Sequence, residues 1–176
     1  PDPTCAKMTI SIINKCGNLS GQTHWVKGFA GSGKSVLLVC MVERVLTQEP
    51  DAKVCVLAYT HALKDMLQNG IQPEFEDRVR VITKDEFLRE VENEQYDFVV
   101  LDEVQDIPKN QLSRIKNRSD TLVVAGDSEQ SIFVNDCSSE NEIIEVLTPD
   151  VDVLNTIFRL TQRLKEVVCT FLPNSR

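Results

Sequence analysis

The stretch GFAGSGKS at residues 28–35 decides the fold class, because it matches the pattern G-x-x-x-x-G-K-[ST]. Its glycines let successive backbone N–H groups turn inward around an anion, since a side chain there would block both the turn and the close approach. The residues after it form an apolar pattern typical of a helix, whose positive N-terminal end would face the same anion. The pattern therefore predicts a phosphate-binding loop between a strand at residues 24–26 and a helix at residues 35–47.

This loop supplies the candidate ligands of a nucleoside triphosphate. Lys34 would reach the β- and γ-phosphates, and the hydroxyl of Ser35 would hold Mg²⁺. A glycine-rich turn without a ligand is the alternative interpretation, and the strand–loop–helix context favours the phosphate loop. The predicted nucleotide-binding residues here are Gly28, Ala30, Gly31, Ser32, Gly33, Lys34 and Ser35.

Further along the chain, apolar β-branched runs alternate with helical stretches. The runs predict strands at residues 53–58, 79–83, 97–101 and 121–125, and helical character at residues 61–69 and 84–92. Short apolar strands separated by helices indicate an α/β fold with a mostly parallel sheet covered by helices on both faces. The polar residues 136–141 predict a loop. Residues 1–23 give no clear pattern, so we expect an N-terminal segment there and one domain at residues 24–176.

A second chemical signal lies at residues 98–106, FVVLDEVQD. An apolar strand that ends in two acids places both carboxylates at the carboxyl edge of a parallel sheet, where the phosphate loop also lies. Asp102 is then placed to hold Mg²⁺, directly or through water. Glu103 is placed to orient or deprotonate an attacking water. An acidic surface loop is the alternative, and the phosphate loop upstream favours the catalytic interpretation.

Composition narrows the class of protein. A chain of 176 residues has the length of one domain, and its net charge of −8 argues against coating DNA by bulk attraction, although a local groove is compatible with it. The six cysteines form no C-x-x-C pair, which favours reduced thiols over zinc ligands or disulfides. No apolar run could span a membrane and the start is unlike a signal peptide, so we expect an intracellular protein without a membrane partner.

One cluster of positive charge stands out in the second half of the chain. It has no acid within it, so it could contact a phosphate backbone or a partner domain, and a solvated helix face is the default interpretation. Its residues are Lys109, Arg114, Lys116 and Arg118.

Four motifs together resemble those of UvrD/Rep-type superfamily 1 helicases, over about residues 24–165. Besides the phosphate loop and DEVQD at 102–106, they include VAGDSEQSIF at 124–133, LAYTH at 57–61 and IFRLT at 157–161. The resemblance implies the first RecA-like motor domain of such an enzyme, with ATP and Mg²⁺ as cofactors. It also implies a single-stranded nucleic acid partner, DNA favoured over RNA, and a second RecA-like domain in the parent chain.

The resemblance also implies roles for individual residues. Gln130 would sense the γ-phosphate, Arg159 would stabilise charge on it during hydrolysis, and Phe158 would stack on the adenine. Phe158 and Tyr59 are equally compatible with positions in the core. The track of the single strand would include Tyr59, Thr60 and Thr83.

Three departures from the helicase pattern bear on function. Residues 1–20 lack a recognisable adenine-reading glutamine, and the stretch between residues 64 and 102 is too short for the usual helical subdomain. The chain also stops soon after Arg159, so we expect the second motor domain to be absent from it. A non-helicase P-loop ATPase or kinase, and a nucleotide-gated interaction module that hydrolyses little, remain alternatives.

Overall fold

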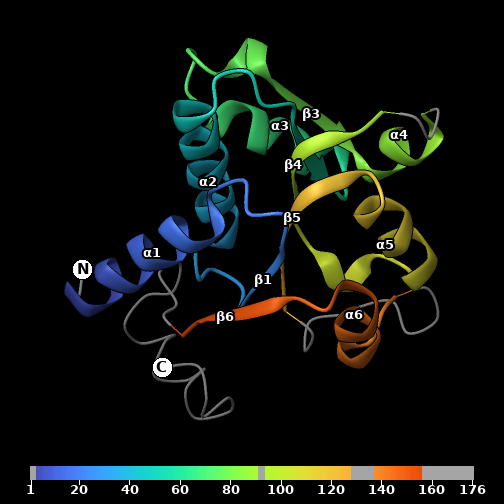
Figure 1. Ribbon diagram of the computed structural model, residues 1–176. Coiled ribbons are helices and arrows are strands. Elements are labelled where there is room, and N and C mark those ends of the chain that lie inside the picture. The colour runs from blue at the N-terminus through green and yellow to red at the C-terminus, as the bar shows by residue number, and fades with distance from the viewer. Residues whose placement is uncertain (1–2, 91–93, 128–136, 156–176) are drawn as a thin grey trace.

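The computed structural model describes residues 3–90, 94–127 and 137–155. Its six strands form one parallel sheet in the order β3-β2-β4-β5-β1-β6 (Figure 1). The strands are β1 (Thr23–Gly28), β2 (Val54–Ala58), β3 (Val79–Thr83), β4 (Tyr96–Leu101), β5 (Ser119–Gly126) and β6 (Asp150–Leu154). The predicted α/β class is confirmed, and the described strands are parallel throughout rather than mostly parallel.

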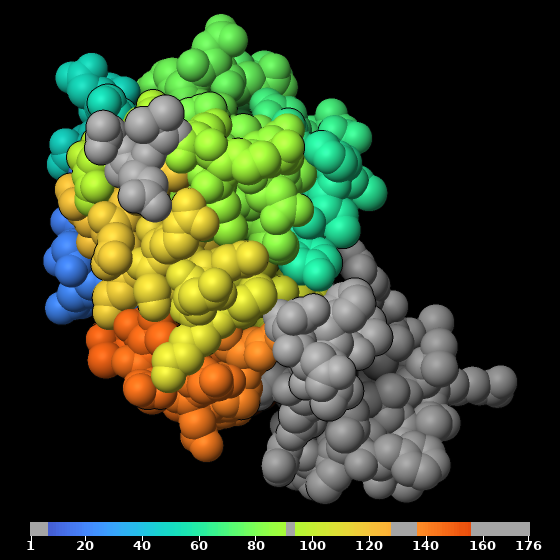
Figure 2. Space-filling view, turned by 90° about the vertical axis from the view of Figure 1, so that its right-hand side faces the viewer, coloured from blue at the N-terminus to red at the C-terminus, as the bar shows by residue number. Residues whose placement is uncertain are grey.

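Helices cover both faces of this sheet, as predicted. On one face lie α1 (Pro3–Cys16), α2 (Lys34–Gln48) and α3 (His61–Gly70). On the other lie α4 (Lys84–Arg89), α5 (Lys109–Lys116) and α6 (Glu140–Leu147), the side that faces the viewer in Figure 2. Two short 3₁₀ turns, η1 (Glu76–Arg78) and η2 (Val104–Asp106), complete the described elements.

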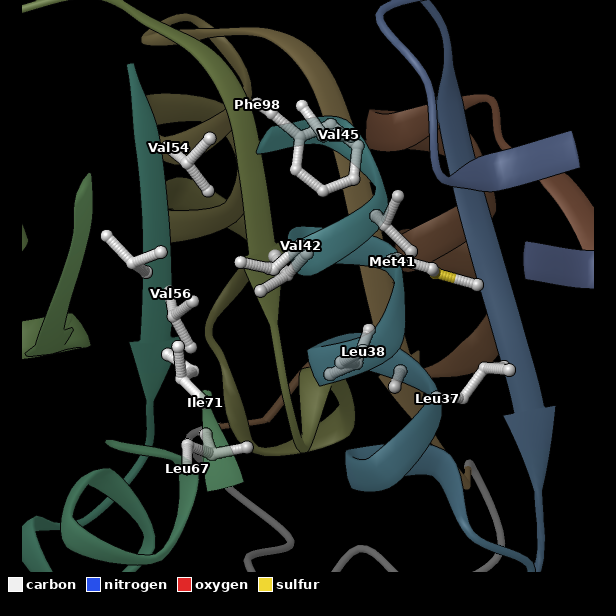
Figure 3. Close-up of a cluster of buried hydrophobic side chains, with 14 of the residues drawn as sticks. Leu37, Leu38, Met41, Val42, Val45, Val54, Val56, Leu67, Ile71 and Phe98 are labelled. Atoms are coloured by element: carbon white, nitrogen blue, oxygen red, sulfur yellow. The ribbon is translucent and has the colours of Figure 1, made fainter. Parts of the chain in front are cut away.

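The core beneath α2 fixes the position of the phosphate loop. One stripe of this helix, with residues three and four apart, is buried against the sheet: Leu37, Leu38, Met41, Val42 and Val45. Figure 3 shows Val42 and Val45 on the side of α2 that faces Val56 and Phe98, and Leu37 and Met41 on the side that faces β1. Full burial of one such side chain contributes about 1.5–3 kcal/mol. The start of α2 is therefore held firmly at the sheet edge.

Three elements differ from the sequence expectation. Helix α1 and strand β6 were not predicted; β6 is an edge strand in which only Leu154 is buried, so its sequence lacks the apolar run of an inner strand. Helix α6 begins inside the predicted loop at residues 136–141. Ser139 Oγ accepts from the Glu142 N–H at 3.4 Å while the Ser139 N–H donates to the Glu142 carboxylate at 2.9 Å. This capping box starts the helix early.

The cluster of positive charge is a solvated face only in part: Lys109 and Arg114 are exposed as predicted, whereas Lys116 and Arg118 are not. Arg118 is 5% exposed, and its guanidinium donates to the carbonyl of Phe87 at 2.6 Å. The ammonium of Lys116 donates to the carbonyls of Val146 and Leu147 at 2.9 and 3.0 Å, so it binds the negative C-terminal end of α6. These contacts direct the two cations into the fold and away from a phosphate backbone.

The described cysteines fit the expected reduced thiols. None of Cys16, Cys40, Cys55 and Cys137 takes part in a disulfide, and Cys55 is fully buried whereas Cys40 is half-buried. The side chains of Cys5 and Cys169 lie outside the described part of the chain. Among the described helices, none is long and apolar enough to cross a membrane.

Candidate functional site

The loop at residues 28–35 has the predicted setting at the carboxyl end of β1. Gly31 and Gly33 have φ angles of 79° and 90°, which glycine adopts at little cost and which other residues adopt rarely. Gly28 is needed for space, because a Cβ there would lie 2.7 Å from Ser32 Oγ and 3.0 Å from the Leu154 side chain. The helix begins at Lys34, one residue earlier than predicted, with Gly33 as its N-cap.

Polar groups of this loop gather around Gly28. The ammonium of Lys34, 7% exposed, donates to the carbonyls of Gly28 at 2.7 Å and Phe29 at 3.2 Å. The buried hydroxyl of Ser32 has no hydrogen-bond partner among the described residues. A buried, unpaired hydroxyl is costly, so its presence in a glycine-rich turn indicates a polar ligand.

Asp102 joins the acidic motif to this loop. It follows β4 and is 1% exposed, and its Oδ2 accepts a 2.5 Å hydrogen bond from Ser35 Oγ. Burial raises the pKa of Asp102 above its ordinary value, opposed in part by the hydrogen bond from Ser35. Strand β5 separates β1 from β4 in the sheet, yet the first turn of α2 reaches across it. The two predicted Mg²⁺ ligands therefore touch, and hydroxyl and carboxylate oxygens are donors that Mg²⁺ prefers.

Glu103 occupies a strained position beside Asp102. Its φ and ψ of 56° and 49° are left-handed, which costs a non-glycine residue roughly 1–2 kcal/mol. Its N–H donates to Asp102 Oδ1 at 3.0 Å, and its carboxylate accepts from Gln105 Nε2 at 2.7 Å. Such strain recurs at functional sites, where the surrounding contacts maintain it.

Gln105 is a residue to which the sequence analysis gave no role. It is 3% exposed, and while its amide nitrogen donates to Glu103, its Oε1 accepts from the Asp127 N–H at 3.1 Å. Gly126 makes room for it, since a Cβ at Gly126 would lie 2.2 Å from that oxygen. Gln105 thus connects the acid after β4 to the backbone at the end of β5. The glutamine in DEVQD and the glycine before Asp127 were the available signals.

A cavity of about 310 Å³ opens beside the phosphate loop. Helix α1 forms one wall with Thr9 and Ile13, and α2 forms another with Val36 and Cys40. Ser32, Gly33, Leu37 and Leu154 complete the lining. Among these residues there is no amide, carboxylate or cationic side chain, so the cavity fits a flat, largely apolar group next to the phosphates.

The predicted nucleic-acid residues lie at the same carboxyl edge but differ in what they offer. Tyr59 and Thr60 follow β2; Thr60 is exposed and its hydroxyl caps α3 by accepting from the Leu63 N–H at 3.2 Å. Lys84 Nζ lies 5.2 Å from the centre of the Tyr59 ring. Thr83, beside Ala58 on the next strand, is 4% exposed, and its hydroxyl accepts from the Glu86 N–H in a capping box. The contacts of Thr83 are those of a helix cap.

Three predicted site residues, Gln130, Phe158 and Arg159, lie outside the described residues. The structure therefore brings together the phosphate loop, Asp102 and Glu103, with Tyr59 and Thr60 at the same edge of the sheet.

Comparison with known proteins identifies the family. The profile of Schlafen group 3, DNA/RNA helicase domain, matches residues 22–167. This chain belongs to that family. No curated protein sequence matches it significantly.

Solved structures of three nucleic-acid enzymes share the fold of this Schlafen group 3 domain. Pif1 helicase from Candida albicans has a TM-score of 0.59 and 19% identity, over 95% of this chain and 43% of that one. The arterivirus helicase nonstructural protein 10, solved with DNA, has a TM-score of 0.60 and 16% identity, over 94% of this chain and 43% of that one. The SWI2/SNF2 ATPase core of Sulfolobus solfataricus, solved with double-stranded DNA, has a TM-score of 0.60 and 14% identity, over 98% of this chain and 52% of that one.

These similarities establish a RecA-like helicase-domain fold, which confirms the predicted fold class. At such low identities they carry no residue roles. The chain spans about half the length of these three structures or less.

Proposed function

We propose that this domain binds Mg·ATP and hydrolyses it, as one half of a motor that acts on nucleic acid. The observation that carries the proposal is the 2.5 Å contact between Ser35 Oγ and Asp102 Oδ2, which joins the phosphate loop to the acidic motif. Chance glycine-rich turns and acidic surface loops do not predict this contact. A phosphate-binding site that also holds a divalent cation needs these two groups next to each other.

Each residue of the site then has a chemical role. The N–H groups of the loop and of the first turn of α2, together with Lys34, bind the phosphates. Ser35 and Asp102 would hold Mg²⁺, which when bound neutralises charge on the phosphate oxygens. Glu103 accepts a proton from the attacking water, and Gln105 holds the Glu103 carboxylate in place. The cavity beside Val36 receives the base.

The finer helicase assignment is part of the same proposal. The resemblance to UvrD/Rep-type enzymes supports γ-phosphate sensing by Gln130, charge stabilisation by Arg159 and base stacking by Phe158. A second RecA-like domain of the parent protein would close the nucleotide cleft. We place single-stranded nucleic acid, DNA before RNA, over Tyr59 and Thr60, where an aromatic ring and a hydroxyl lie at the sheet edge. Thr83 is left out because its hydroxyl caps α4.

Calorimetry and turnover test this assignment. Lys34→Ala should abolish Mg·ATP binding, whereas Lys7→Ala, which changes an exposed lysine of α1, should leave binding unchanged. Glu103→Gln should keep binding and, in the complete protein, lower turnover by about 10²–10⁴-fold, the usual cost of losing a positioned base. Unchanged affinity in Lys34→Ala would remove the site.

The rival functions make a different prediction for nucleic acid. In the complete protein, single-stranded DNA or RNA at low salt should raise ATP turnover, because phosphate contacts are strongest there. A kinase or a nucleotide-gated interaction module would show no such stimulation. An absence of stimulation alongside normal nucleotide binding would therefore refute the motor and retain the nucleotide site.

A further inference from the structure

A second group of chemically active side chains lies at the other end of the sheet from the phosphate loop. Cys16 ends α1, His24 lies near the start of β1, and Asp152 lies on the edge strand β6 beside it. One ligand atom from each of these three residues lies within 4.8 Å of the others. Cys16 and His24 are buried, and Asp152 is half-buried. The spacing of the cysteines in the sequence favoured reduced thiols over zinc ligands, and it is the fold that brings His24 to Cys16.

We propose that Cys16, His24 and Asp152 form a binding site for one zinc ion. Thiolate sulfur, imidazole nitrogen and carboxylate oxygen are the three ligand types that zinc takes from proteins, commonly with water as the fourth ligand. Zinc bonds of about 2.3 Å to sulfur and 2.0 Å to oxygen place those two atoms roughly 3.5 Å apart in a tetrahedral site. Cys16 Sγ and Asp152 Oδ2 are 3.7 Å apart in the structure.

The hydrogen bonds of His24 point independently to a metal. This side chain is 1% exposed, and its Nδ1 has no hydrogen-bond partner among the described residues. Its Nε2 lies 3.4 Å from the hydroxyl of Ser20. Metal-binding histidines use one ring nitrogen for the metal and hold the other with an outer hydrogen bond. Ser20 supplies that outer contact, which leaves the buried Nδ1 to bind the ion.

Charge balance accommodates the ion once Lys15 moves. The Lys15 ammonium donates to Asp152 Oδ2 at 3.0 Å and lies 3.8 Å from Asp150 Oδ2. A zinc ion would displace it from Asp152, and Asp150 offers a second carboxylate close by. The charges of one thiolate and one carboxylate then cancel those of zinc. Lys15 is therefore a competitor of the metal, and the ion would fix the end of α1 to β1 and β6.

Cobalt titration of the metal-stripped 176-residue chain tests the site, because Co²⁺ bound by a thiolate gives a charge-transfer absorption that histidine and carboxylate alone do not give. We expect one Co²⁺ per chain with that absorption, displaced by Zn²⁺. Cys16→Ser, His24→Gln and Asp152→Asn should each weaken binding by at least about 10–100-fold, the range for loss of an outer contact. Cys137→Ser, which changes a cysteine outside the cluster, is the matched control and should bind normally.

Lys15→Met distinguishes a metal site from a cluster that only stabilises the fold. It removes the competing cation, so Co²⁺ and Zn²⁺ should bind more tightly than to the parent. A missing charge-transfer band in the unmodified chain, which needs no variant to fold, or equal binding by Cys16→Ser and Cys137→Ser would each overturn the proposal.

Discussion

Gly126→Ala is the most direct test of the connection between the acidic motif and β5. The added Cβ would lie 2.2 Å from Gln105 Oε1, 2.8 Å from Val104 Cγ1 and 3.1 Å from the Val104 nitrogen. Gly126 does not have a left-handed φ, so alanine suits its backbone conformation and the perturbation is steric. The Gln105 side chain must therefore leave its place, and the hydrogen bonds to the Asp127 N–H and to Glu103 are lost with it.

Two terms set the size of the effect. Overpacking against Val104 costs about 1–3 kcal/mol. Loss of the buried hydrogen bond from the Asp127 N–H to Gln105 Oε1 costs about another 0.5–1.5 kcal/mol. Since the side chains relax together, we expect the unfolding free energy to fall by about 2–4 kcal/mol. For a domain of this length, that lowers the melting temperature by on the order of 10 °C.

Urea unfolding followed by circular dichroism measures the loss, with Gly70→Ala as the matched control. Gly70 ends α3, and a Cβ there would meet only Val39 Cγ2 at 3.5 Å, an ordinary contact. That variant should be neutral or slightly stabilised. In the complete protein, Gly126→Ala should also turn over ATP more slowly at unchanged affinity, because Glu103 loses its partner. A Gly126→Ala chain with the parent's unfolding midpoint would refute the packing of Gln105 described above.

Three further predictions follow from the site and its edge. Burial raises the pKa of Asp102, so the carboxyl group of Asp102 contributes stability at low pH, and this contribution is lost as pH rises through its pKa. As pH falls from neutral toward the ordinary carboxyl range, the unfolding free energy of the parent, measured in urea, should therefore rise relative to that of Asp102→Asn. A relative stability that does not change with pH would contradict this. Because the described lining of the cavity beside the loop has no base-reading amide or charge, ATP, GTP, CTP and UTP should bind within about tenfold of one another by calorimetry, and strict selection of ATP would place a base-reading group elsewhere. Thr83→Val should remove the cap of α4 and lower the unfolding free energy by about 1 kcal/mol in the same urea assay, with no effect on binding of single-stranded nucleic acid.

The sequence predicted the structure correctly where a single local requirement, such as a left-handed backbone angle or a strand buried on both faces, restricts which residues can occupy a position. Glycines at 31 and 33 have left-handed backbones, and the apolar runs of β2 and β4 are buried on both faces, so pattern and structure agree there. The site followed from the same logic, because the carboxyl ends of parallel strands share one edge. That edge places Asp102 against Ser35 although they are 67 residues apart.

Helix α1 and the burial of Arg118 could not be predicted, because they depend on contacts with residues far away in the sequence. Helix α1 is held by Ile12 and Cys16, one turn apart, in the core beneath α2, and its outer residues include the exposed Ile10. Arg118 was misassigned because a charged residue next to a helix is usually solvated, whereas here the guanidinium lies 3.9 Å from the Phe87 ring centre and donates to a buried carbonyl. Both outcomes were decided by partners distant in the sequence.

The carboxyl edge also concentrates groups that disfavour the ligand-free fold. Asp102 is a buried carboxyl, Glu103 has one of the two positive φ angles among the described non-glycine residues, and the Ser32 hydroxyl is buried without a described partner. Phosphate oxygens and a divalent cation would interact with the hydroxyl and the carboxylate directly. Groups that lower the stability of the ligand-free domain would then contribute to ligand binding, which stabilises it by about 2.7 kcal/mol at a ligand concentration one hundred times the Kd. Substitutions that relieve these costs should therefore raise the stability of the domain alone and weaken its nucleotide binding together.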